Sequence, residues 1–213
     1  MSSPARATAL PPTSATASTR SPSSSTPTLR TAEVTAAPRI TEATEATEPV
    51  VKTFDQLLPA ELYGILQLRS LAFVVEQECV FLDADGVDTL PETLHFFYPR
   101  PATAMSDTHG AEHGRDLSPW AYARLLPADV PDGPAARPGA RSISRVATHP
   151  DARGQGWGRR LLGDIVDAWS ATPLTLNAQS HLGRLYSSFG FVPNGSRFDE
   201  DGIEHTPMER PAG

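Results

Sequence analysis

The sequence contains a single cysteine, Cys79, among its 213 residues, so no intrachain disulfide can form. A lone cysteine is typical of a reducing compartment, and we predict a cytoplasmic protein. The sequence also lacks an apolar run near the length of about 18 residues that a membrane-spanning helix needs. Basic residues are outnumbered, with 18 Lys and Arg against 25 Asp and Glu. An acidic chain is a poor candidate for nucleic-acid binding, so we expect neither a nucleic-acid nor a membrane partner.

Residues 1–48 contain no aromatic residue and no regular apolar period. Most of them are Ser, Thr, Ala or Pro, and their arginines and glutamates balance. Such a segment cannot bury enough apolar surface to offset its ordering entropy, which predicts a disordered tail. Arg6, Arg20 and Arg30 leave an import peptide open, although the many prolines disfavour the amphipathic helix that mitochondrial import prefers. The net charge of −7 therefore belongs to the domain predicted for residues 49–213.

Residues 49–213 alternate between segments of strand and helix character. The apolar patterns predict strands at 48–54, 93–99, 120–127, 141–150 and 173–179, and helices at 58–77, 158–171 and 180–190. Asp201-Gly202 is a hairpin signal between two further extended segments, 191–198 and 203–210. Strands joined partly by hairpins and partly by helices indicate a mixed α+β sheet in one domain.

Three closely spaced glycines, Gly154, Gly156 and Gly158, stand where the strand 141–150 passes into the helix 158–171. Glycines permit positive φ and a close approach of the backbone to a ligand. The free amides of a helix N-terminus form an anion site, and Arg153 and Arg159 add positive charge. The spacing fits neither the Walker loop, which needs a following Lys, nor the Rossmann fingerprint G-x-G-x-x-G. The turn therefore predicts a phosphate or pyrophosphate site of another kind.

The pattern that does fit is [QR]-x-x-G-x-[GA], supplied by Arg153, Gly156 and Gly158. Here the chain resembles the GNAT superfamily of acyl-CoA-dependent N-acyltransferases. A second block, LTLNAQSHLGRLYSSFGFVP, is similar to the family's later strand–helix unit, and LYGILQLRSLAFVVEQECVFLDADGVD with EDGIEH resembles the ElaA-like branch. The resemblance covers most of residues 52–210 and departs in the loops 100–118 and 127–141. It implies the GNAT fold, an α+β domain whose mixed, mostly antiparallel sheet of about six to seven strands contains a splayed parallel pair and has flanking helices.

The resemblance implies acetyl-CoA as co-substrate and assigns its contacts by position. Main-chain contacts to the pantetheine arm fall on Val146, Ala147 and Thr148. Asn177 would face the gap where the thioester lies, unless it caps local backbone instead. The pyrophosphate contacts fall on the turn and the start of the following helix: Arg153, Gly154, Gln155, Gly156, Trp157, Gly158 and Arg159.

The implied chemistry is direct attack of an amine on a thioester. Tyr186 matches the family's position for the acid that protonates the departing thiolate or holds it by a hydrogen bond. The alternative role for this side chain is core packing with Phe189 and Phe191.

The region between Ser70 and Pro99 carries six acids and no Lys or Arg. By resemblance it borders the acceptor side, where an acidic mouth would attract a cationic amine. Glu76 is the candidate for general base or amine anchor, although a solvated acidic face is an equal alternative. The candidate substrate contacts are Asp83, Asp85, His95 and His205, and a buried structural role is the commoner outcome for such histidines.

No metal site is predicted. His109 and His113 do not form H-E-x-x-H, and DADGVD lacks the register and closing Glu of an EF-hand. The sequence predicts an acetyl-CoA-dependent N-acetyltransferase that acts, as a monomer or homodimer, on a cationic small-molecule or peptide amine. A non-catalytic acyl-CoA-binding module, with the tail recruiting partners, stays open as the alternative.

Overall fold

The computed structural model describes residues 48–101, 115–128 and 130–213. The predicted tail (1–48) lies outside this part except for Glu48, and so do His109 and His113. The strands and helices are β1 (Val50–Lys52), α1 (Pro59–Arg69), β2 (Leu94–Tyr98), β3 (Ala121–Leu125), β4 (Arg141–Thr148), α2 (Trp157–Ala168), β5 (Leu174–Gln179), α3 (Gly183–Ser187), β6 (Val192–Pro193), β7 (Phe198–Glu200) and β8 (Ile203–Arg210).

The strands form one mixed sheet in the order β1-β2-β3-β4-β5-β8-β6, and β7 also pairs with β8. Only β4 and β5 run parallel, and every other neighbouring pair is antiparallel. The predicted fold class is confirmed. The strand count exceeds the expected six to seven because the segment 191–200 contributes two short strands, β6 and β7, of 2 and 3 residues.

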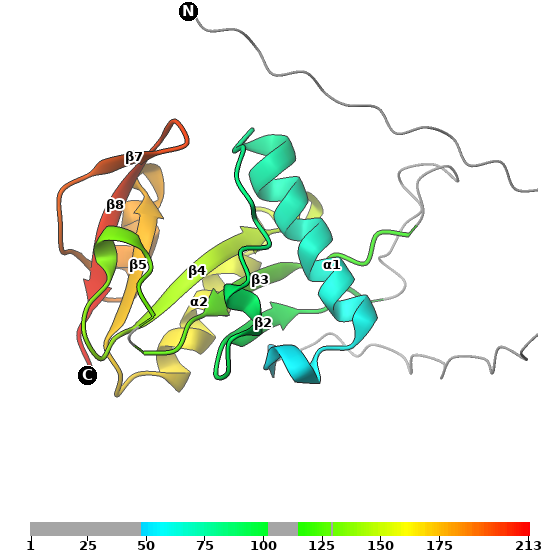
Figure 1. Ribbon diagram of the computed structural model, residues 1–213, viewed down its shortest axis with the longest axis horizontal. Helices are drawn as coiled ribbons and strands as arrows, with labels where there is room; N and C mark the ends of the chain where they lie inside the picture. The colour runs from blue at the N-terminus through cyan, green and yellow to red at the C-terminus, as the bar shows by residue number, and fades with distance from the viewer. Residues whose placement is uncertain (1–47, 102–114, 129) are drawn as a thin grey trace, which may run out of the picture. The chain divides into compact units, whose positions relative to one another are not determined.

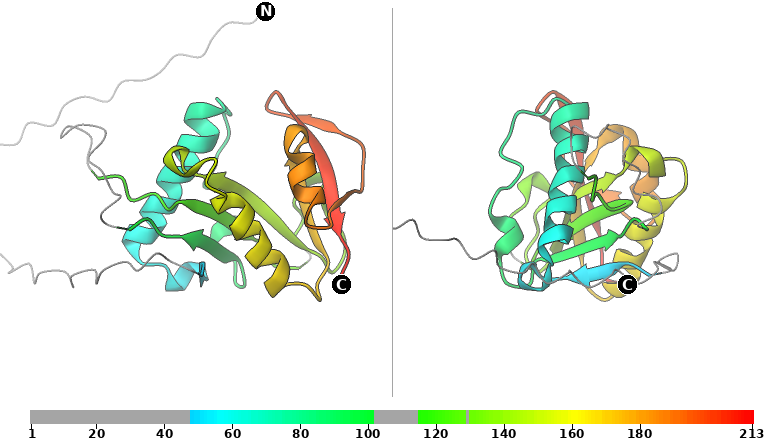
Figure 2. Two further views of the ribbon diagram at one scale, coloured as in Figure 1. Left: turned by 180° about the vertical axis from the view of Figure 1, so that it is seen from behind. Right: turned by 90° about the vertical axis from the view of Figure 1, so that its right-hand side faces the viewer.

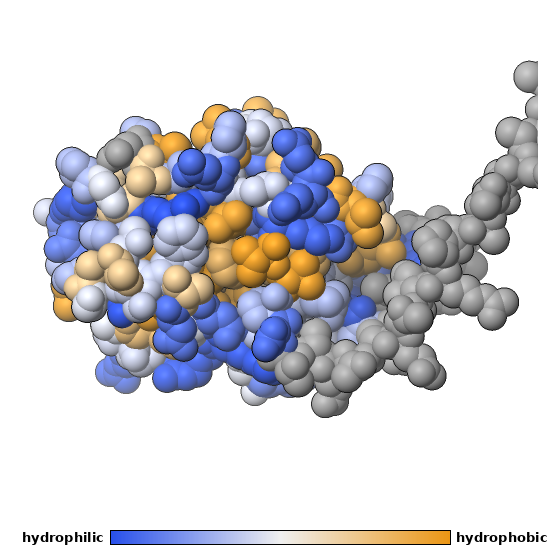
Figure 3. Space-filling view, turned by 90° about the horizontal axis from the view of Figure 1, so that it is seen from below, coloured by the Kyte–Doolittle hydropathy of each residue, from blue (hydrophilic) through white to orange (hydrophobic). Residues whose placement is uncertain are grey.

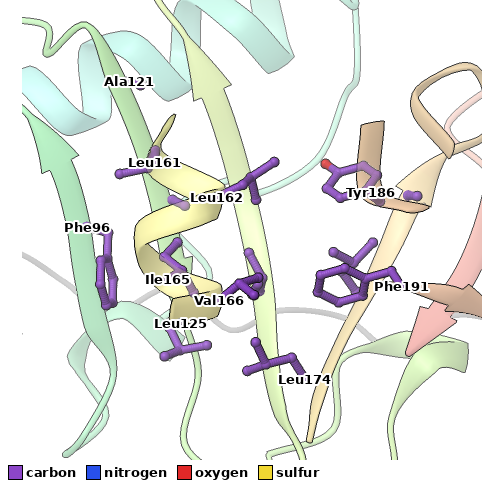
Figure 4. Packing of buried hydrophobic residues seen from close by; sticks show 14 of the residues in the cluster. Phe96, Ala121, Leu125, Leu161, Leu162, Ile165, Val166, Leu174, Tyr186 and Phe191 are labelled. Carbon is purple, nitrogen blue, oxygen red and sulfur yellow. The ribbon is translucent and has the colours of Figure 1, made fainter. Parts of the chain in front are cut away.

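The helices cover both faces of the sheet, with α1 on one face and α2 and α3 on the other (Figures 1 and 2). The predicted apolar face of α2 is buried, and Leu161, Leu162 and Ile165 are each no more than 1% exposed. They pack against Phe96, Leu125 and other sheet residues (Figure 4). Burying side chains of this size contributes about 1.5–3 kcal/mol each. This face of the sheet therefore holds the main core.

A smaller core lies between α1 and the opposite face of the sheet. Ile65 and Leu68 pack there against Phe97, Tyr122 and Ala147. Pro59 occupies the start of α1, a position where its missing N–H costs nothing. The predicted helix 58–77 continues past α1, but in a different form, because Ser70–Glu76 is a π-helical segment.

The β7–β8 hairpin is closed by the predicted Asp-Gly turn. Asp201 and Gly202 have φ values of 53° and 81°, the left-handed pair that a tight two-residue hairpin requires. Asp199 accepts a hydrogen bond from the Gly202 amide at 3.1 Å. The sequence determines this hairpin locally.

Apolar side chains also lie on the surface of the domain. Seen from below, apolar residues gather near the centre of a mostly hydrophilic face (Figure 3). Scattered apolar side chains are ordinary on folded proteins. Within 48–101, 115–128 and 130–213, none of the helices has both the length and the apolar character needed to cross a membrane.

Candidate active site

The parallel strands β4 and β5 separate along their length. Their ladder holds only two residue pairs, Arg141 with Leu174 and Ser142 with Thr175. β5 stays paired with β8 as far as Gln179. Beyond the two pairs the strands diverge, as Figures 1 and 4 show. The C-terminal half of β4 thus presents an edge that pairs with no other strand among the described residues.

A β-bulge in β4 lies beside this free edge. Tyr122 faces Ala147 and Arg124 faces Ser144, so β4 holds one more residue than β3 between these pairs. Arg145 lies in the bulge with a φ of 53°. The left-handed conformation costs a non-glycine residue about 1–3 kcal/mol, so surrounding contacts must hold it in place.

The bulge decides which backbone groups reach the free edge. The His149 amide donates to the Trp120 carbonyl at 2.9 Å, so it points toward β3. Because backbone groups alternate between the two edges of a strand, Val146 and Thr148 direct theirs to the free edge, as a pantetheine arm would need. Ala147, the third predicted contact, directs its groups to β3 instead and packs its side chain under α1.

The glycine turn joins β4 to α2. Gly154 and Gly156 have φ values of 75° and 86°, which glycine adopts without strain. α2 begins at Trp157, so the amides of its first turn lack partners within the helix and are available to an anion. At position 158 glycine is required for lack of space, because a Cβ there would lie 2.7 Å from Thr148 Oγ1. Only glycine lets α2 approach β4 so closely.

Three of the seven predicted pyrophosphate residues line one open cavity at this turn. An open cavity of about 200 Å³ is lined by Gln155, Gly156, Trp157 and Arg160. The Arg159 guanidinium turns toward the segment after α3, where it donates to Ser188 Oγ at 3.0 Å. The turn therefore combines helix-end amides with positive side chains, which is the donor set that a pyrophosphate requires.

Tyr186 lies on α3, across the sheet from α1. Its ring packs edge-to-face on Phe191 and is 5% exposed. Its hydroxyl points toward β4 and Leu162, into the space where β4 and β5 diverge (Figure 4). Burial raises the pKa of Tyr186 to about 12, so the hydroxyl keeps its proton at neutral pH. The ring thus serves the core while the hydroxyl faces the strand divergence.

The acids of the 83–88 segment are neutralised. Asp83, Asp85 and Asp88 form ion pairs with three arginines from α1, β3 and β4, namely Arg69, Arg124 and Arg145. Burial alone would raise the pKa of Asp85, but hydrogen bonds from Arg124 hold it below its usual value. Asp83 and Asp85 were expected to face a substrate. The structure instead pairs both with Arg145, the residue in the β4 bulge, so these aspartates stabilise the bulge.

The two predicted acceptor histidines occupy different settings. His95 is fully buried, and its Nδ1 accepts from the Tyr122 hydroxyl at 2.9 Å while Nε2 donates to the Asp88 carbonyl. It therefore belongs to the same scaffold as the acids. His205 lies on β8, where it stacks on Phe198 and donates from Nδ1 to the Ile203 carbonyl at 2.8 Å.

Asn177 uses its side chain within the protein. Its Nδ2 donates to the Asp132 carbonyl at 2.8 Å, and its Oδ1 accepts from the Ala135 amide at 3.2 Å. This is the backbone-capping alternative raised by the sequence, applied to the loop 132–135 rather than to its own strand. A contact between Asn177 and the cofactor stays a prediction.

The segment after α1 contacts both the glycine turn and the end of β5. Glu76 forms an ion pair with Arg153 of the glycine turn. Gln179 at the end of β5 donates to Gln77 at 2.9 Å. Sequence reasoning missed Gln77, Gln179 and the scaffold role of Arg145, because nothing in their residue types or spacing signals partners so distant in the chain.

This geometry has close counterparts in known proteins. The chain is 33% identical to protein ElaA of Escherichia coli over 159 residues, which cover 73% of this chain and 90% of ElaA. The chain belongs to the GNAT superfamily, in the group of ElaA. The family described as "Acetyltransferase (GNAT) domain" matches residues 133–211 of this GNAT chain. A UPF0039 protein of Mycobacterium tuberculosis is 36% identical over 150 residues, covering 70% of this chain and 84% of that protein.

Solved structures agree with the GNAT assignment. An acyl-CoA N-acyltransferase from Pseudomonas aeruginosa superposes with a TM-score of 0.61 at 35% identity, covering 76% of this chain and 98% of that one. Escherichia coli ElaA gives a TM-score of 0.60 with the same coverage of both chains. The GNAT fold implies acyl-CoA binding. Over the part of the chain described here, no group of three or more His, Cys, Asp or Glu side chains is placed to hold a metal ion.

Proposed function

We propose that this GNAT chain transfers an acetyl group from acetyl-CoA to a primary amine of a small molecule or peptide by direct attack. The observation that carries the proposal is the divergence of β4 and β5. It leaves the backbone groups of Val146 and Thr148 without a strand partner among the described residues, beside the N-terminus of α2. The Thr148 carbonyl accepts from Arg153 Nε at 3.4 Å, and the Tyr186 hydroxyl faces the same space. A linear thioester with a phosphorylated end is the ligand that this combination suits.

Different residues of the site bind the pantetheine arm and the pyrophosphate of acetyl-CoA. Val146 and Thr148 pair with the amides of the pantetheine arm in the manner of a missing strand. The amides at the start of α2 and the Arg153 guanidinium hold the pyrophosphate. These contacts bind the substrate at both ends of the arm and so fix the thioester between β4 and β5, which supplies the orientation that direct attack requires.

Tyr186 assists the departure of the thiolate by a hydrogen bond. With its pKa raised to about 12, complete proton transfer to a thiolate of reference pKa ~8.5 would be unfavourable by about 5 kcal/mol. A hydrogen bond from the intact hydroxyl stabilises the developing negative charge without that cost. The buried, protonated hydroxyl therefore acts as an oxyanion-type donor for sulfur.

The acceptor approaches from the face that carries α1. Glu76 borders that approach, and its ion pair with Arg153 already commits its carboxylate to positive charge. We assign Glu76 the role of anchor for a cationic amine rather than that of proton acceptor. Because the aspartates of the 83–88 segment are neutralised, attraction of a cation rests on Glu76, Glu78 and the acids of the β7–β8 hairpin.

The experiment measures thiol release from acetyl-CoA with spermidine, glucosamine and an unblocked tripeptide as acceptors. Acceptor-dependent release, with formation of the acetylated amine, supports the proposal. A thermal shift with acetyl-CoA and no turnover with any acceptor would instead support the acyl-CoA-binding module. We expect a cytoplasmic enzyme, monomeric or homodimeric, and gel filtration with light scattering checks the oligomeric state.

A further inference from the structure

The proposed reaction needs a proton acceptor that the GNAT fold by itself does not specify. An amine with a pKa of ~10.4 is neutral in only about one molecule in 2,500 at pH 7. Some group on the α1 face must therefore take a proton from the attacking nitrogen. The contacts of each side chain show whether it still has a lone pair that can accept this proton.

The carboxylates near α1 are engaged. Asp83, Asp85 and Asp88 each bind an arginine at 2.7–2.9 Å, and Glu76 is held by Arg153. A carboxylate that neutralises a guanidinium serves as a structural partner first. These four side chains are therefore engaged by arginines, and the buried histidines are the next candidates for the proton acceptor.

Two of the buried histidines use both ring nitrogens. His95 binds the Tyr122 hydroxyl through Nδ1 and the Asp88 carbonyl through Nε2. His149 accepts from the Asp151 amide at Nδ1, and its Nε2 lies 3.1 Å from an Asp116 oxygen. Neither ring has a lone pair to offer a substrate.

His205 differs from both. Its Nδ1 faces the Ile203 carbonyl at 2.8 Å, and because a carbonyl only accepts, Nδ1 must carry the proton. Nε2 is then the basic nitrogen, and it has no hydrogen-bond partner within the described segments. The residue is 9% exposed, and stacking on Phe198 with ring centroids 5.6 Å apart restricts the ring further.

The strand register places His205 on the face from which the amine approaches. Gln179 and His205 are directly paired between β5 and β8, so their side chains share one face of the sheet. Leu176 and Met208 point to the other face, into the core under α2 and α3. Gln77, arriving from the α1 side, contacts Gln179 at 2.9 Å. His205 thus lies beside the end of β5 that borders the strand divergence.

The segment Gln77–Cys79 lies near the end of β5, since Gln77 accepts a hydrogen bond from Gln179. Burial raises the pKa of the Cys79 thiol, and the charges of Asp201 and Glu200 on the hairpin raise it further. The hairpin turn and this segment are therefore close in space. His205 itself lies on β8 between its partners in the two neighbouring strands, Gln179 of β5 and Phe198 of β7.

We propose that His205 is the general base of the transfer, an inference that rests on the acetyltransferase function proposed above. Its Nε2 accepts the proton of the attacking amine, directly or through one bound water. The nitrogen forms its bond to the acyl carbon, the C–S bond breaks, and the thiolate leaves toward Tyr186 on the opposite face and takes up the second proton that the nitrogen releases. The imidazolium then returns its proton to solvent.

The test uses His205→Asn in the full chain, because Asn can keep the hydrogen bond to the Ile203 carbonyl while removing Nε2. With the acceptor that wild type acetylates among spermidine, glucosamine and the tripeptide, we expect kcat to fall about 10²–10⁴-fold. The KM for acetyl-CoA should not change. His181→Gln, which alters an exposed histidine on the surface, is the matched control and should keep wild-type turnover.

Two further readouts separate a base from a structural residue. Imidazole in the buffer should restore part of the activity of His205→Ala, which a merely structural role would not allow. Methoxyamine, which is neutral at pH 7, should be acetylated by His205→Asn with far less loss than the cationic acceptor. Equal losses for both nucleophiles, or wild-type turnover in His205→Asn, would overturn the assignment of the base alone. Absence of turnover in wild type would overturn the proposed function and the base together.

Discussion

Arg153 of the glycine turn forms an ion pair with Glu76, the last residue of the π-helical segment after α1. The pair joins the turn that we propose binds the phosphates to the segment that we propose borders the acceptor. A pyrophosphate bound at this turn would have to share the donors of the Arg153 guanidinium with the Glu76 carboxylate. Binding of CoA should therefore compete with the ion pair between Glu76 and Arg153.

Glu76→Gln should raise the affinity for CoA about twofold to fivefold, because an exposed ion pair of this kind is worth about 0.2–1 kcal/mol. Isothermal titration calorimetry with CoA measures the change. Pantetheine lacks the pyrophosphate and should bind both proteins equally, which makes it the control ligand. A weaker affinity for CoA in Glu76→Gln would show that Glu76 positions Arg153 for the phosphates instead of competing with them.

Tyr186→Phe should lower kcat about 10²–10³-fold while acetyl-CoA binds as in wild type, because the variant loses one hydrogen-bond donor to the leaving sulfur. The hydroxyl has no hydrogen-bond partner in the described part of the chain, so its removal should leave the melting temperature nearly unchanged. Steady-state kinetics and a thermal shift assay with acetyl-CoA give the two values. Tyr63→Phe, at a position that is 59% exposed, is the control. Full activity in Tyr186→Phe would reduce the residue to its packing role.

Gly158→Ala should weaken CoA binding and lower the melting temperature, because the new Cβ would lie 2.7 Å from Thr148 Oγ1. Overpacking of this kind costs about 1–3 kcal/mol. Thr148→Ala removes the opposing atom but keeps the backbone groups, so the double variant should recover much of both losses. Gly163→Ala is the matched control, since its Cβ would meet Phe189 at an ordinary 3.6 Å. No recovery in the double variant would contradict this steric account.

Asp116 should make stability depend on acid pH. Burial raises its pKa, but hydrogen bonds from Ser118 and the Arg100 guanidinium outweigh this and bring it to about 2. An unfolded Asp has a pKa of ~3.9, so the contribution of about 2 kcal/mol is complete above that pH and is lost as pH falls toward 2. The difference in unfolding free energy between wild type and Asp116→Asn should therefore be largest at pH 6.

Urea unfolding of both proteins at pH 6 and at pH 3 measures that difference. It should shrink by roughly half at pH 3, where the unfolded carboxyl is mostly protonated and the folded one is not. Asp151→Asn, which alters a side chain that is 62% exposed, is the control and should show little dependence. A difference that stays constant between the two pH values would rule out this linkage.

Local patterns in the sequence determined much of the fold. The apolar spacing of Leu161, Leu162, Ile165 and Val166 predicted the buried face of α2, and Asp201-Gly202 predicted the β7–β8 turn. Both are set by contacts between near neighbours, namely helical periodicity and left-handed backbone conformation. The resemblance carried by Arg153, Gly156 and Gly158 indicated the family and the location of the anion-binding turn.

The tertiary structure decided what the polar residues do. Asp83 and Asp85 stand in a stretch without any basic residue, so the sequence suggests a free acidic mouth. The fold brings Arg69, Arg124 and Arg145 to them from α1, β3 and β4, and the charges cancel because a buried carboxylate needs a partner. In the same way, pairing β5 with β8 sets Gln179 beside His205, and among the described residues one ring nitrogen of His205 has no hydrogen-bond partner. Spacing along the chain determined the donor side, and only contacts between distant strands decided the acceptor side.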